Sequence, residues 1–241
     1  MPDIETALQR LRAILPLEAG QNQLPESLRL THLLILRFFL EEGCAPTSGD
    51  ITGDLEWSAT LQQLETAGLI VLDAGCIAIA YPFSAGDRGY RVTSAYGRVE
   101  AVCAFDALAI GSMFSLPTRI DSHCQLSGEA ITIQQNGQDF ETELNVIAAI
   151  DWSAADSGKS CAASLCTEML FIGNQSLADA WRAESSSQRE LFTLQQAQRF
   201  ICAFFLPLVA PEQPCYVASS QKTATTVNRC KTDTQHQTFS D

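Results

Sequence analysis

The sequence has little positive charge. Its 15 lysines and arginines face 28 aspartates and glutamates, which gives a net charge of −13 over 241 residues. Nucleic acids and anionic membrane surfaces both select for positive patches on their protein partners. We therefore expect no nucleic-acid partner and no membrane partner.

The chain also lacks a long hydrophobic run. Its most apolar stretch, residues 33–40, is interrupted by Arg37 and is too short to span a bilayer. The first 20 residues place charged side chains at helical spacing and do not resemble a secretory signal. These absences predict a soluble, cytoplasmic protein.

A Cys-x-x-Cys pair is missing, although the chain has nine cysteines. The missing pair argues against a zinc ribbon and a thioredoxin-like motif, and the odd number argues against a disulfide framework. Cysteines in apolar surroundings usually behave as small buried hydrophobic residues. We expect this of Cys44, Cys76 and Cys202.

Residues 1–80 have the pattern of a winged helix. Apolar spacing predicts helices over 1–20, 28–42, 51–57 and 59–67, the last capped by Ser58, followed by a two-stranded ribbon over 69–72 and 76–80. The predicted recognition helix, 59–67, has no lysine or arginine, so it cannot neutralise DNA phosphates. We predict a structural or substrate-covering subdomain.

The remaining chain predicts an α+β fold with a mixed or antiparallel β-sheet core and flanking helices. Strands are expected over 89–96, 116–122, 129–134, 140–150 and 164–172, and helices over 177–183 and 194–206, the last closing on Pro207. Residues 81–210 then form the catalytic domain. Residues 211–241 are polar and predict a disordered tail.

The segment 98–114 carries the most unusual chemistry. Its apolar spacing predicts a helix whose buried stripe, running from Val99 to Met113, includes both Cys103 and Asp106. A carboxyl on a buried stripe must be hydrogen-bonded, paired or catalytic, and burial raises its pKa enough to make it a proton donor. A thiol beside a proton donor points to chemistry on a soft electrophile, above all a metal ion.

Three motifs resemble those of the alkylmercury lyase family. They are Val102-Cys-Ala-Phe-Asp-Ala-Leu108, then Ser122-His-Cys124, and then Ser164-Leu-Cys-Thr-Glu-Met-Leu-Phe171. The resemblance covers roughly residues 28–206. It implies Cys103, Asp106 and Cys166 as the catalytic set and a structural role for Cys124, with Thr167 where relatives can have a second cysteine.

The implied reaction is protonolysis of a carbon–mercury bond. The Cys103 and Cys166 thiolates would bind mercury, and Asp106 would donate the proton that releases the hydrocarbon. Hg²⁺ would remain on these residues until external thiols remove it, with a low-molecular-weight thiol or a mercuric reductase as acceptor. No organic cofactor is expected.

Alternatives remain at this point. Cys161 competes with Cys166 as the second thiol, although we expect it on a loop. His123 is either a metal ligand or a structural histidine, and Cys215 and Cys230 in the tail are candidates for carrying mercury. The other functions to consider are a non-catalytic protein that binds mercury or copper on the same fold, and a metal sensor.

Overall fold

The computed structural model describes residues 3–51 and 56–209. Its first part is helical: α1 (Ile4–Ile14), α2 (Leu17–Asn22), α3 (Glu26–Glu42) and α4 (Trp57–Thr66). The single helix predicted over 1–20 is wrong, because Pro16 separates α1 from α2 and precedes the first residue of α2. Helix α3 ends as predicted at Gly43, which adopts the left-handed conformation with φ of 73°.

The predictions around residue 55 have mixed outcomes. The short helix predicted over 51–57 falls mainly on residues 52–55, outside the described residues. Ser58 does not cap the following helix, because α4 already begins at Trp57, with Glu56 in the capping position. The ribbon is confirmed as β1 (Ile70–Asp73) paired antiparallel with β2 (Cys76–Ala80).

The ribbon belongs to a larger antiparallel sheet of eight strands, in the order β1-β2-β3-β5-β4-β6-β7-β8. The further strands are β3 (Phe83–Ser84), β4 (Arg91–Ser94), β5 (Gly97–Ala101), β6 (Thr118–His123), β7 (Ala130–Asn136) and β8 (Asp139–Glu141). The strand predicted over 89–96 is therefore the first arm of a hairpin, β4–β5. Because β2 pairs with β3, the sheet continues past residue 80, and the domain boundary predicted there stays a prediction.

A second antiparallel sheet has the order β10-β9-β11, with β9 (Ile147–Asp151), β10 (Met169–Ile172) and β11 (Arg189–Thr193). The strand predicted over 140–150 is thus two strands in different sheets, β8 and β9. Between β9 and β10 the chain forms three short 3₁₀ helices: η1 (Trp152–Ala154), η2 (Cys161–Ala163) and η3 (Leu165–Glu168). Only the second half of the strand predicted over 164–172 is a strand.

Two helices complete the described chain, α6 (Gln175–Ala183) and α7 (Leu194–Val209). Pro207 does not close α7 as predicted but lies inside it. A proline has no N–H to donate to the carbonyl four residues earlier, which here belongs to Ala203. That carbonyl instead accepts a hydrogen bond from Arg12 Nη2 of α1, 3.2 Å away.

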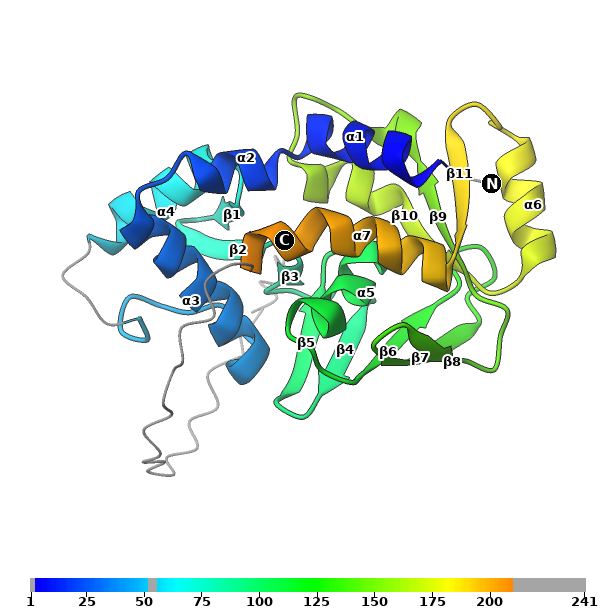
Figure 1. The fold of residues 1–241 in the computed structure, drawn as a ribbon, viewed down its shortest axis with the longest axis horizontal. Helices are drawn as coiled ribbons and strands as arrows, with labels where there is room; N and C mark the ends of the chain where they lie inside the picture. Colours follow the sequence, from blue (N-terminus) through cyan, green and yellow to red (C-terminus); the bar gives the residue numbers. More distant parts are fainter. Residues whose placement is uncertain (1–2, 52–55, 210–241) are drawn as a thin grey trace, which may run out of the picture. The chain divides into compact units, whose positions relative to one another are not determined.

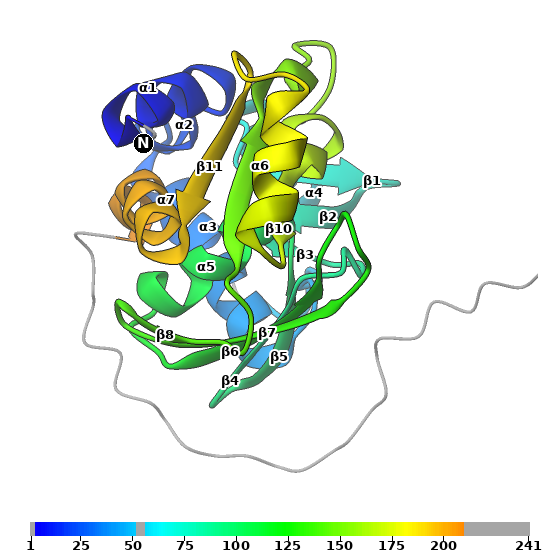
Figure 2. The ribbon, with the colours of Figure 1, turned by 90° about the vertical axis from the view of Figure 1, so that its right-hand side faces the viewer.

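Helix α5 (Ala104–Met113) lies at the centre, between the two sheets and against α7 (Figures 1 and 2). Residues 104–111 are all buried, so the helix has no solvent-exposed face along most of its length. The ring of Phe105 meets Phe192 of β11 and Phe200 of α7 edge-to-face, at 5.5 and 5.6 Å between centroids. The α+β fold predicted from the sequence, with its helical N-terminal part, is confirmed.

All described residues belong to one compact unit. No helix in the described ranges is long and apolar enough to cross a membrane. The predicted tail, 211–241, lies outside the described residues.

Candidate active site

Cys103 stands at the start of the central helix. Strand β5 ends at Ala101 and α5 begins at Ala104, so Cys103 is the N-cap residue, with extended backbone angles. The helical stripe predicted from Val99 is therefore wrong in its first half, because Val99 lies in β5. The Cys103 side chain is only 1% exposed.

Asp106 occupies the first turn of α5. The Cys103 thiol donates a hydrogen bond to Asp106 Oδ2 at 2.8 Å, and Cys103 Sγ accepts one from the Asp106 backbone N–H at 3.5 Å. A carboxylate in a first turn is favoured by the helix dipole. Burial nevertheless dominates and raises the Asp106 pKa to about 7, although the bond from Cys103 and the charge of Arg88 oppose the shift.

Cys166 lies beside Cys103 and Asp106, although it is about 60 residues further along the chain. It lies in the 3₁₀ turn η3 and not in a core strand, which corrects the sequence interpretation. Its Sγ, Cys103 Sγ and an Asp106 carboxylate oxygen all lie within 4.8 Å of one another, and all three residues are buried. The structure thus brings together the three residues that the resemblance selected.

Both thiols are protonated in the free protein at neutral pH. Burial raises the pKa of Cys103 to about 12. Hydrogen bonding with Cys103 and then with Cys161, together with burial, raises the pKa of Cys166 well above its usual value. A metal ion that binds here must displace thiol protons.

Cys161 is the residue that the sequence reasoning misplaced. It is 5% exposed, in η2, and its Sγ lies 3.5 Å from Cys166 Sγ. The next residue, Ala162, is held at both ends of its backbone: its N–H donates to the Tyr81 hydroxyl at 3.0 Å, and its carbonyl accepts from Arg88 Nη1 at 3.0 Å. Neither Tyr81 nor Arg88 belongs to a motif that the sequence would single out.

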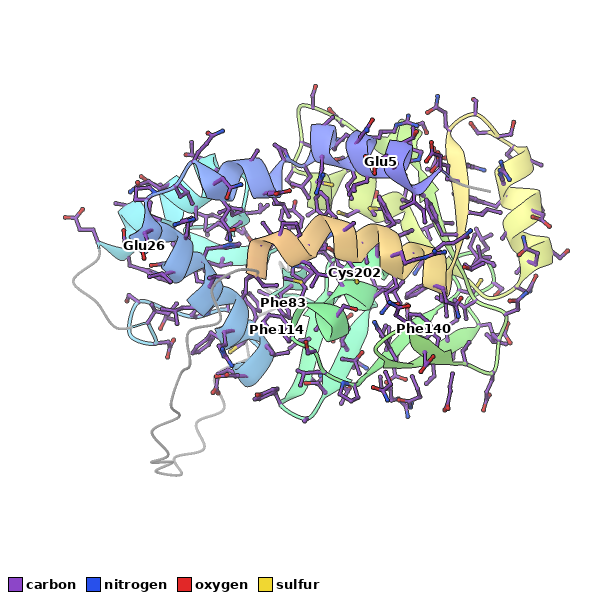
Figure 3. All side chains as sticks on the ribbon, in the orientation of Figure 1. Glu5, Glu26, Phe83, Phe114, Phe140 and Cys202 are labelled. Atoms are coloured by element: carbon purple, nitrogen blue, oxygen red, sulfur yellow. The ribbon has the colours of Figure 1, made fainter. Side chains whose placement is uncertain are left out.

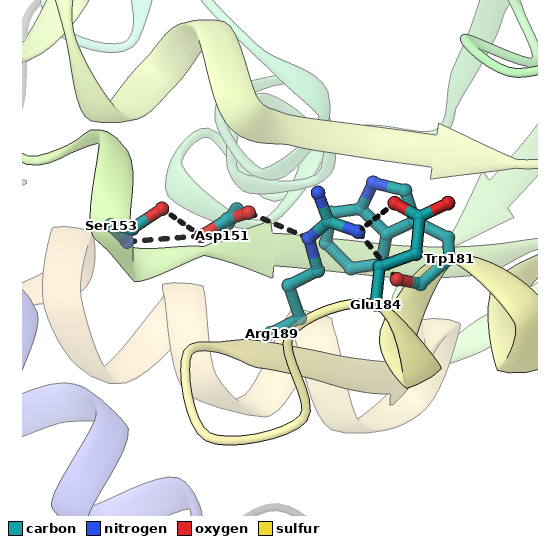
Figure 4. A network of polar contacts seen from close by, with 5 residues as sticks. All are labelled: Asp151, Ser153, Trp181, Glu184 and Arg189. Atoms are coloured by element: carbon teal, nitrogen blue, oxygen red, sulfur yellow. Dashed lines mark hydrogen bonds and ion pairs between the residues drawn. The ribbon is translucent and has the colours of Figure 1, made fainter.

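The segment η1–η3 is anchored to the small sheet by a polar network (Figure 4). Asp151, at the end of β9, accepts hydrogen bonds from the backbone N–H and hydroxyl of Ser153 in η1, and from Arg189 Nε of β11 at 2.6 Å. Arg189 also pairs with Glu184 and stacks over the Trp181 ring. The network fixes where the chain leaves β9 toward Cys161 and Cys166.

The remaining candidates lie elsewhere. His123 is exposed at the end of β6, and Cys124 is buried. Neither residue belongs to the group of potential metal ligands found among the described residues, which consists of Cys103, Asp106 and Cys166. Cys76 is exposed and Cys44 and Cys202 are half-buried, so the prediction of three buried cysteines is wrong (Figure 3 shows Cys202 on α7). Cys215 and Cys230 lie outside the described residues.

Two thiols and a carboxyl at this separation suit a soft, thiophilic cation. Sulfur selects such metals, whereas hard cations prefer sites made of oxygen. The carboxyl accepts a hydrogen bond from one of the two sulfurs, an arrangement that is also chemically suited to proton transfer.

Comparison with known proteins agrees with this chemistry. The crystal structure of the mercury-bound form of MerB2 shares the fold, with a TM-score of 0.62 and 20% sequence identity over 80% of this chain and 98% of that one. No curated protein matches the chain in sequence. The model of the alkylmercury lyase family (MerB) matches residues 83–206, just over half of the chain and the part that contains α5 and η3. The chain therefore belongs to the alkylmercury lyase family.

Proposed function

We propose that this protein cleaves the carbon–mercury bond of R–Hg⁺ compounds by protonolysis, with Cys103, Asp106 and Cys166 as the reacting groups. The observation that supports this most directly is the cluster of two thiols and one carboxyl within 4.8 Å, buried at the start of the central helix. A site that only bound a soft metal would need the sulfurs but not a carboxyl whose pKa lies near neutrality.

Binding begins with exchange of thiol protons for mercury. The first Hg–S bond forms as the substrate's own ligand leaves with one proton, and the second forms as the other thiol loses its proton. The Cys103 S–H already points at Asp106 Oδ2. When mercury binds Cys103, the thiol proton therefore passes to Asp106, which becomes the acid of the next step.

Cleavage follows from the added sulfur donation. Two thiolates raise the electron density on mercury and weaken its bond to carbon, so carbon leaves with the bonding pair. The proton on Asp106 goes to this carbon, and the products are R–H and an Hg²⁺ ion held by two sulfurs. The charges and protons balance without an organic cofactor, and Hg²⁺ then passes to an external thiol, with a low-molecular-weight thiol or a mercuric reductase as acceptor.

The test is anaerobic incubation with phenylmercury and excess small thiol, with benzene measured by gas chromatography. The parent protein is expected to release benzene, and Cys103→Ala and Cys166→Ala are expected to release none. Cys76→Ser, which removes an exposed thiol on β2, is the matched control and should behave as the parent. If the parent retained mercury without releasing benzene, the protein would be a soft-metal carrier.

A further inference from the structure

Three sulfurs, and not two, meet at this site. Cys166 is close to both of the others: its Sγ lies within 4.8 Å of Cys103 Sγ and 3.5 Å from Cys161 Sγ. Cys161 is not part of the compact cluster with Cys103 and Asp106. The three thiols therefore form a row with two neighbouring dithiol pairs that share Cys166.

All three cysteines are buried, and the outer pair, Cys161 and Cys166, differs from Cys103 mainly in having exposed chain neighbours. Cys103 is 1% exposed, whereas Cys161 and Cys166 are each 5% exposed. The outer pair is flanked by exposed positions, namely the loop 155–159, Ala163 and Thr167. The hydrogen bonds of Tyr81 and Arg88 to Ala162 hold Cys161 in this position independently of Cys103.

We propose that Cys161 is a product-transfer thiol: it takes Cys103's place on the Hg²⁺ ion, so that Cys161 and Cys166 hold the product near the surface. This inference rests on the proposed cleavage at Cys103 and Cys166. It assigns to Cys161 a step that follows that cleavage.

The step is a thiol exchange and needs no further reactant. The Cys161 thiol forms a bond to Hg²⁺ as the Hg–Cys103 bond breaks, and the proton that leaves Cys161 restores the Cys103 thiol. Mercury keeps two sulfurs throughout, with Cys166 as the ligand common to both states. The exchange returns Cys103 and Asp106 to their hydrogen-bonded starting state. Cys166 becomes free for the next substrate when an incoming thiol removes the product.

The experiment uses the full chain in a background where Cys44, Cys76, Cys202, Cys215 and Cys230 are serine. Benzene release from phenylmercury first shows whether this background folds and cleaves, which tests the proposed function separately. The background protein, Cys103→Ser, Cys103→Ser/Cys161→Ser and the matched control Cys103→Ser/Cys124→Ser are then loaded with HgCl₂. The mercury retained per chain after gel filtration in 2-mercaptoethanol is measured.

Cys103→Ser and the Cys124 control are expected to retain about one mercury per chain, bound by two sulfurs in X-ray absorption spectra. Cys103→Ser/Cys161→Ser should retain at least about tenfold less mercury, because one sulfur of the outer pair is missing. Equal retention in Cys103→Ser and the Cys161 double variant would overturn the proposal.

A second measurement is independent of the Cys103 variant's folding. The background protein loaded with HgCl₂ should transfer its mercury to 2-mercaptoethanol about tenfold faster than Cys161→Ser does. Equal transfer rates would likewise overturn the proposal, whatever the result with phenylmercury.

Discussion

Asp106 and Cys103 act as one proton-holding unit, because the thiol of one donates to the carboxylate of the other at 2.8 Å. Burial disfavours the charged form of both groups, and their pKa values of about 7 and about 12 place one shared proton on the pair over a wide pH range. In the proposed reaction mercury binds the sulfur, and the Asp106 carboxylate, already hydrogen-bonded to that thiol, accepts its proton.

Asp106→Asn should separate binding from cleavage. The amide cannot pass a proton to carbon, so benzene release from phenylmercury should fall by about 10²–10⁴-fold, while both sulfurs still bind mercury. Benzene by gas chromatography and bound mercury by elemental analysis measure the two effects. Asp87→Asn, an exposed carboxyl outside the cluster, is the control, and an Asp106→Asn protein that cleaved at the parent rate would remove Asp106 from the mechanism.

The pH dependence of the first turnover should reveal where the proton comes from. Above pH 7 the free Asp106 carboxyl loses its proton, but Cys103 keeps one up to a pKa of about 12 and supplies it when mercury binds. At saturating phenylmercury, benzene release in a single turnover should therefore change less than about threefold between pH 6 and 9. A tenfold loss per pH unit above 7 would mean instead that Asp106 must be protonated by solvent before the substrate binds.

At the scale of elements, the sequence predicts regular structure better than the turns that carry chemistry. The ribbon over 69–80 and the turn at Gly137 follow from residue types, since β-branched and apolar runs end at residues that accept positive φ; Gly75 and Gly137 have φ of 80° and 60°. Cys166 was expected in a strand because its neighbours are apolar. A buried 3₁₀ turn can have the same apolar residues as a buried strand. The apolar pattern of the four residues of η3 therefore cannot distinguish a turn from a strand.

The same limitation explains the start of α5. Val99 continues the helical spacing by coincidence, while pairing with Val92 of β4 places it in a strand. Helix α5 begins at Ala104, five residues after Val99, so Cys103 is the N-cap and Asp106 is a first-turn residue. The resemblance of motifs predicts that Cys103, Asp106 and Cys166 lie together. The position of Cys161 depends on η2, a turn that none of these motifs includes.

Arg189 forms ion pairs with two carboxylates that differ in exposure. The Asp151 side chain is 8% exposed, and that of Glu184 is 70% exposed. Asp151→Asn should lower the free energy of unfolding by about 2 kcal/mol, because it leaves a partly buried arginine and the start of η1 without their charged partner. Urea unfolding measures this, with Glu184→Gln as the control at less than about 0.5 kcal/mol. Equal effects would show that the buried pair does not anchor the segment η1–η3.

At the scale of the whole molecule, the N-terminal helices and α7 are held together by buried polar contacts as well as apolar ones. Gln21 of α2 donates through Nε2 to the Leu208 carbonyl of α7 and lies 3.1 Å from His32 Nδ1 of α3. His32 is 1% exposed, and its Nε2 is buried without a hydrogen-bond partner among the described residues. The junction of three helices therefore contains a histidine that is stable only when neutral.

This histidine should make the fold sensitive to mild acid. Burial lowers the pKa of His32 to about 4, from 6.5 in the unfolded chain, so the unfolded state takes up the proton first as the pH falls. Its contribution to stability is complete above pH 6.5 and declines from there toward pH 4, and about 2 kcal/mol should be lost between pH 7.5 and 5. Urea unfolding at the two pH values tests this against His32→Leu, in which that part of the acid sensitivity should disappear. If parent and variant lost equal stability, protonation of other groups would control acid unfolding, and the junction of α2, α3 and α7 would not limit it.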